Sequence, residues 1–241
     1  MDLENDFTQV KTGVKSSNAV QAEQTRYLLR VYNWMGGGLL LTGLVAWFTS
    51  QSSALINMLA ANPLIPIGLF IGQIALVGVL AFRVMKVRAK TAAMLFLGYA
   101  ILTGLSFSFI FLAYTKSSIA ATFVVTAGTF GAMSLYGAAT KKDLTSWGSF
   151  LFMGLVGIMI AFIVNIFLQS SMVQWVASGI GVLVFTGLTA YDTQKILQMN
   201  IIGNEGTEED TKEAIRGALT LYLDFINLFL MLLHFMGGNR D

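Results

Sequence analysis

The sequence predicts an all-α polytopic membrane protein with seven transmembrane helices. First, 55% of the 241 residues are hydrophobic and only 12% are charged, whereas a typical soluble domain carries about 25% charged residues. Second, no Asp, Glu, Lys or Arg occurs within residues 31–82, 91–115, 117–140 or 144–191. Third, these stretches are continuously apolar rather than alternating, which excludes the strands of a membrane β-barrel.

The length of each charge-free stretch predicts how many helices it contains, because about 20 apolar residues span a bilayer. The two shorter stretches hold one span each. The two longer ones hold two each. The first is divided by polar residues near 50–53 and by Asn62-Pro63, and the second by polar residues at 169–171. With a last apolar stretch near the C-terminus, we expect spans at roughly 31–49, 64–83, 92–113, 119–139, 147–168, 174–196 and 215–236.

The basic residues set the orientation. In this topology 13 of the 15 Lys and Arg residues lie on one side of the membrane, and basic loops stay cytoplasmic. The chain then divides into a cytoplasmic polar tail, 1–30, a transmembrane domain, 31–237, and a short outside C-terminus, 238–241. The loop at about 197–214 carries five acids. We interpret it as a solvated loop, with a regulatory or cation-collecting role as the alternative.

Composition and motifs exclude several classes of function. A net charge of +2 gives no nucleic-acid footprint, and the absence of Cys excludes a disulfide scaffold. No HExxH, GxSxG or P-loop motif is present, so we predict that the chain is not an enzyme. An intramembrane aspartyl protease is the one enzyme class that two membrane acids can serve, but Asp224 lacks the Gly-x-Gly that precedes such an aspartate.

Two acids fall inside predicted spans, Asp192 late in the sixth and Asp224 in the first half of the seventh. Charges are costly inside a bilayer, so such residues indicate function. Consecutive spans are antiparallel, so the two carboxylates can meet in the cytoplasmic half of the membrane. Two carboxylates in a poorly solvated site cannot both ionise cheaply and titrate as a pair. The pair is therefore a candidate pH sensor and a candidate Ca²⁺ site.

Other polar residues near these spans have simpler interpretations. Each acid can instead be neutral or bonded to a neighbour such as Asn165 or Tyr222. Arg83 and Lys86 end the second span, where they either reach the interface by snorkelling or pair with one of the acids. We expect Gln73 and Asn165 to form interhelical hydrogen bonds.

Glycine is abundant, with 24 residues. Small residues let membrane helices approach closely. We interpret the GxxxG step on the second span and the glycines of the fourth as packing contacts, with hinges as the alternative. These glycines are Gly68, Gly72, Gly128, Gly131 and Gly137.

The two acids lie in motifs that carry a family resemblance. The sixth span ends Phe-Thr-Gly-Leu-Thr-Ala-Tyr-Asp-Thr-Gln-Lys at 185–195. The seventh reads Ala-Leu-Thr-Leu-Tyr-Leu-Asp-Phe-Ile-Asn-Leu-Phe-Leu at 218–230. The chain resembles the Bax inhibitor-1 family, also called the transmembrane BAX inhibitor motif family, and in particular its bacterial inner-membrane members. The resemblance covers about 26–237.

The resemblance implies a bundle in which the seventh helix is central and wrapped by the other six. It implies a pH-sensitive calcium leak across the inner membrane, in which the chain sits in the lipid bilayer and handles Ca²⁺ and H⁺ without a resident cofactor. The family's paired aspartates correspond to Asp192 and Asp224, and its latch cation to Arg83 or Lys86. Gln73 stands where some members carry an acid.

The same motifs contain the remaining polar residues of the expected site, Tyr191, Tyr222 and Asn227. A further implication is a membrane-anchored protease as partner, bound through the cytoplasmic tail. The alternative function is therefore a regulator that transports nothing and acts on such a protease or on a stress response.

Overall fold

The computed structural model describes residues 17–238, which form helices and no β-strand within that range. The all-α prediction is therefore confirmed. The helices are α1 (Ser17–Gln51), α2 (Ser53–Ala61), α3 (Leu64–Arg83), the 3-10 turn η1 (Val84–Lys86), α4 (Ala89–Phe107), α5 (Ile110–Ala113), α6 (Lys116–Ala139), α7 (Thr145–Leu168), α8 (Ser171–Met199) and α9 (Glu208–Met236).

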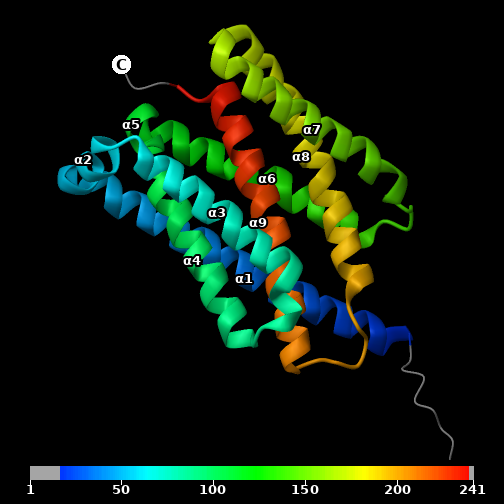
Figure 1. Ribbon diagram of the computed structural model, residues 1–241. Coiled ribbons are helices and arrows are strands. Elements are labelled where there is room, and N and C mark those ends of the chain that lie inside the picture. Colours follow the sequence, from blue (N-terminus) through cyan, green and yellow to red (C-terminus); the bar gives the residue numbers. More distant parts are fainter. Residues whose placement is uncertain (1–16, 239–241) are drawn as a thin grey trace, which may run out of the picture.

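Six helical segments in the described residues are long and apolar enough to cross a membrane on their own. A seventh span is present if α1 and α2 count together, since they meet at a bend of 94°. The described residues therefore accommodate the predicted seven spans. Figure 1 shows the start of α1 and the end of α9 at opposite ends of the bundle, as an odd number of spans requires.

Two segments predicted to lie outside the spans, the polar tail and the loop at about 197–214, are partly helical. The tail was expected to extend to residue 30, yet α1 begins at Ser17; residues 1–16 lie outside the described range. Tyr27, Val31 and Met35 are buried along one face of α1. Their four-residue spacing is that of an amphipathic helix, so α1 extends on the N-terminal side of the predicted first span. Similarly, α9 begins at Glu208 inside the expected loop 197–214.

The start of α9 has a local cause. The Thr207 side chain accepts a hydrogen bond from the Asp210 amide at 3.1 Å and caps the helix. Three acids in the first turn face the positive end of the helix dipole.

Helix α9 is the central element. In its most apolar stretch of 18 residues 61% are buried, whereas the corresponding stretches of α8 and α3 are 39% and 6% buried. It packs against α1, α4, α6 and α8, and α3 and η1 touch it at one end. In Figure 1, α7 lies on the far side of α8 from α9. Because α7 packs on α8 and hardly contacts α9, the expectation that all six other spans wrap the seventh is wrong for α7.

Candidate functional site

The structure brings Asp192 of α8 and Asp224 of α9 together. Asp224 is only 6% exposed, and Asp192 is half-buried. The two carboxyl groups line the same cavity and are close enough to interact electrostatically. The second oxygen of Asp224, Oδ2, is buried and has no hydrogen-bond partner. Such an atom needs a proton or a cation to compensate its burial.

Both acids line a cavity of about 740 Å³ between α7, α8 and α9, which we name the acidic groove. Helix α8 forms its floor, because α7 and α9 flank α8 with little contact between them. Phe152 and Met153 on the α7 wall are 62% and 64% exposed, so the groove is open on the lipid-facing side. Its polar lining comprises Thr145, Ser149, Tyr191, Asp192, Lys195, Thr220, Asp224 and Asn227.

A second cavity of about 400 Å³, which we name the inner vestibule, lies at the predicted cytoplasmic end of the bundle. Met85 of η1 and residues of α1, α8 and α9 line it. The inner vestibule and the acidic groove share Asp192, Lys195 and Thr220. Asp192 therefore stands between an opening at the end of the bundle and the buried Asp224.

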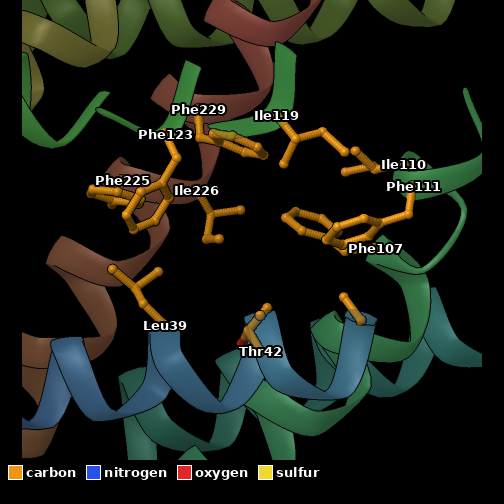
Figure 2. Close-up of a pocket in the computed structure, with 12 residues that line it drawn as sticks. Leu39, Thr42, Phe107, Ile110, Phe111, Ile119, Phe123, Phe225, Ile226 and Phe229 are labelled. Atoms are coloured by element: carbon orange, nitrogen blue, oxygen red, sulfur yellow. The ribbon is translucent and has the colours of Figure 1, made fainter. Parts of the chain in front are cut away.

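On the other side of Asp224 the interior is apolar. A cavity of about 100 Å³ lies between α1, α4, α5, α6 and α9, and Thr42 is its one hydroxyl-bearing lining residue. Figure 2 shows the rings of Phe107, Phe111, Phe123 and Phe229 around this space. We name it the apolar seal. A hydrated ion cannot be stabilised among these side chains.

The candidate latch residues do not reach the acid pair in this conformation. Arg83 and Lys86 are exposed at the end of α3 and in η1, and within residues 17–238 neither forms an ion pair with Asp192. Lys195 lies three residues further along α8 and lines both cavities together with Asp192. A latch formed by Arg83 or Lys86 stays a prediction about another conformation.

The supporting polar residues separate into two groups. Tyr191 and Asn227 line the acidic groove beside the acids. Gln73 instead joins α3 to α4, donating to Ser106 Oγ at 2.7 Å, as expected for an interhelical hydrogen bond. Asn165 does not bridge helices, because its Oδ1 accepts from the Ser170 amide at the end of α7.

Tyr222 is also placed differently from the expectation that it bonds an acid. It is fully buried, and its hydroxyl lies 2.6 Å from Thr42 Oγ1. It therefore bonds Thr42 of α1 rather than an acid.

Two features of the site escaped the sequence interpretation. Lys195 follows Asp192 by three residues, a spacing that places both on one helix face, so this signal was available. The second feature is an ion-pair network that ties α1 to the start of α9. Arg26 contacts Glu205 at 2.7 Å, and Arg30 contacts Asp210 at 2.9 Å. These partners lie about 180 residues apart in the chain, and no local pattern connects them.

This network corrects the interpretation of the acidic cluster as a solvated loop. Asp210 is buried, and Glu208 accepts a hydrogen bond from the Ala89 amide at 2.7 Å. Hydrogen bonds from Arg26 lower the pKa of Glu205 to about 2. These acids fasten the α8–α9 connection to the rest of the bundle.

The groove offers only a few oxygen ligands to a cation. Among the described residues no cluster of three or more His, Cys, Asp or Glu side chains forms a metal site. Ca²⁺ takes 6–8 oxygen ligands. Asp192, Asp224 and the Asn227 amide supply fewer than that, so water has to complete the shell of any bound Ca²⁺.

The fold and site define a class: a multi-pass helical membrane protein in which two acids on consecutive helices meet inside the bundle. The chain belongs to the Bax inhibitor-1 family. The family model described as "Inhibitor of apoptosis-promoting Bax1" matches residues 24–241, which confirms the resemblance seen in the two motifs.

Relatives match nearly end to end. The chain is 54% identical to the inner membrane protein YbhL of Escherichia coli strain K12, over 89% of this chain and 92% of that protein. It is 46% identical to protein RP147 of Rickettsia prowazekii, over 98% of this chain and 99% of the relative. It is 42% identical to a protein of Borreliella burgdorferi, over the same shares.

Proposed function

We propose that this chain is a pH-sensitive calcium leak of the bacterial inner membrane, gated by protonation of Asp192 and Asp224. The observation that carries the proposal is the buried Asp224 oxygen without a partner beside a second carboxyl group. A shared proton satisfies both groups and holds α8 against α9. Loss of that proton leaves two negative charges, which repel each other or attract a cation.

The cavities support a route for the ion. From the inner vestibule a cation first meets Asp192 and then reaches Asp224 in the acidic groove. Beyond Asp224, Phe225, Ile226 and Phe229 of α9 line the apolar seal. Since α9 carries both Asp224 and these residues, a displacement of α9 on deprotonation changes the ion site and the seal together. The proposal assigns no catalytic reaction to the chain.

We further propose that residue 17 lies toward the cytoplasm and residue 238 lies outside. Basic residues crowd the end of the bundle that holds the inner vestibule, among them Lys195 and Arg216. Lys and Arg favour the cytoplasmic side. The inner vestibule therefore faces the cytoplasm, and the acid pair responds to cytoplasmic pH.

Purified protein in liposomes loaded with a calcium-sensitive dye tests the proposal. Flux is expected to vary with pH in the wild type, and Asp192→Asn or Asp224→Asn is expected to remove most of that variation, because an amide cannot exchange the shared proton. Glu209→Gln is the matched control, since Glu209 is 58% exposed on α9 and lines neither cavity.

Unchanged flux and pH response in both aspartate variants would refute gating by the pair. Wild-type liposomes without flux at every pH would favour the regulator of a membrane-anchored protease that the family resemblance implies.

A further inference from the structure

We propose that the acidic groove binds the primary ammonium headgroup of an aminophospholipid that enters from the membrane between α7 and α9. The site uses the same acid pair as the proposed calcium leak. It is nevertheless a distinct property, because it predicts occupancy by a lipid and requires no ion flux.

The shape of the groove fits a lipid rather than a soluble solute. Its volume of about 740 Å³ lies in the range of small-molecule sites, roughly 300–1,000 Å³. One wall is made of apolar side chains, including Leu155, Phe185 and Leu188. The exposed Phe152 and Met153 mark its lateral opening. An acyl chain can lie along this wall while the headgroup reaches inward.

The acceptors at the inner end match an ammonium group with three N–H donors. Asp224 contributes the buried Oδ2 that has no partner, and Asp192 lies beside it. Asn227 donates its amide N–H to the Leu223 carbonyl at 2.8 Å, which leaves its side-chain oxygen as an acceptor. A quaternary ammonium has no N–H to donate and cannot satisfy these three oxygens.

A cation beside the acid pair matches the phosphate that accompanies the ammonium in such lipids. Lys195 lines the groove, with its ammonium over the Tyr191 ring at 5.4 Å. The hydroxyl groups of Thr145 and Ser149 line the facing wall on α7. Because Lys195 follows Asp192 by three residues on α8 and lines the same groove, positive and negative charge lie side by side there, as the phosphate and the ammonium of a zwitterionic headgroup do. Glu213 and Arg216 belong to the adjoining inner vestibule and not to the groove.

The test compares two lipids that differ only in the headgroup amine. Full-length protein in detergent is titrated with dihexanoyl phosphatidylethanolamine or dihexanoyl phosphatidylcholine, and bound lipid is counted by native mass spectrometry. We expect wild type and Glu209→Gln to favour phosphatidylethanolamine by about tenfold or more, since hydrogen bonds to a charged group are among the strong ones. Asp224→Asn is expected to reduce this preference to about one.

Equal binding of the two lipids by wild type would overturn the proposal, as would a preference that survives in both Asp192→Asn and Asp224→Asn. If Asp224→Asn does not fold, Ser149→Trp, which fills the groove away from the acids, must remove binding instead. Competition by free ethanolamine at the same concentration as the lipid would identify a soluble amine as the ligand and refute the lipid. Calcium flux without a lipid preference would support the leak and refute lipid binding. A lipid preference without calcium flux would support lipid binding and refute the leak.

Discussion

The polarity of a residue and its depth in a predicted span identify some functional residues in this sequence, but they assign wrong neighbours to others. Asp192 and Asp224 could be found from sequence because an acid interrupting an apolar run has few explanations besides function. Asn165 and Tyr222 were offered as their neighbours on similar grounds, yet Asn165 ends α7 and Tyr222 donates to Thr42. The direction in which a side chain points depends on helix rotation, which an almost uniformly apolar helix does not encode.

The hydrogen bond between Tyr222 and Thr42 is a contact that could not be predicted from the sequence, because the two residues are 180 positions apart. Thr42 donates its own proton to the Ala100 carbonyl at 2.9 Å, so the Tyr222 hydroxyl is the donor to Thr42. Phe96 and Tyr99 pack edge-on against the Tyr222 ring. Three helices, α1, α4 and α9, are thus joined at one buried hydroxyl group.

Glu205 provides a prediction about pH that is independent of the acid pair. Its pKa is lowered from 4.5 to about 2 by Arg26 and Arg30. A lowered pKa gives stability that is complete above the ordinary value and is lost as the pH falls toward 2. The network therefore contributes equally at pH 6 and pH 8. We expect Glu205→Gln to lower the thermal unfolding midpoint by the same amount at both pH values and to leave the pH response of flux unchanged.

A changed pH response in Glu205→Gln would mean that this network, rather than the acid pair, senses protons. Glu209→Gln serves again as the control, because its contact with Lys212 is longer, at 3.5 Å, and the carboxylate is more exposed.

At the scale of elements, the sequence predicted the existence of the long helices but not all their contacts. Spans were recognisable because each apolar run is long enough, as a helix, to cross the bilayer. The extension of α1 to Ser17 was missed because its amphipathic spacing lies in polar sequence. Glycines proved equally ambiguous. A Cβ at Gly68, Gly128 or Gly131 would meet no other atom within 4 Å, so the packing interpretation is wrong for these three.

Gly137 is a true close approach and gives a test at this scale. A Cβ there would collide with the backbone of Ala190, including its Cα at 2.9 Å, so α6 cannot stay in place against α8. We expect Gly137→Ala to lower the free energy of unfolding by about 1–3 kcal/mol, as overpacking does. Gly128→Ala on the same helix has open space and is the matched control. Equal stability of the two variants in a thermal unfolding assay would contradict the observed α6–α8 spacing.

For the whole molecule, the proposed orientation can be tested because the chain contains no Cys. Ser117→Cys and Lys141→Cys place single thiols near opposite ends of α6, and both positions are exposed. In intact spheroplasts, a membrane-impermeant maleimide is expected to label Ser117→Cys and to leave Lys141→Cys unlabelled until the cells are lysed. The opposite labelling would invert the orientation and place the inner vestibule outside.

The central position of α9 has a consequence for how the protein is made. The helix at the core follows the other spans in the chain and leaves the ribosome after them, and the Tyr222–Thr42 contact joins residues 180 positions apart. At about 5–20 residues per second, α1 waits roughly ten seconds or more for that partner. Until then the earlier spans enclose an unfilled centre. Assembly of the bundle is therefore completed only once α9 has been made, and a chain that stops before residue 208 lacks the helix around which the others pack.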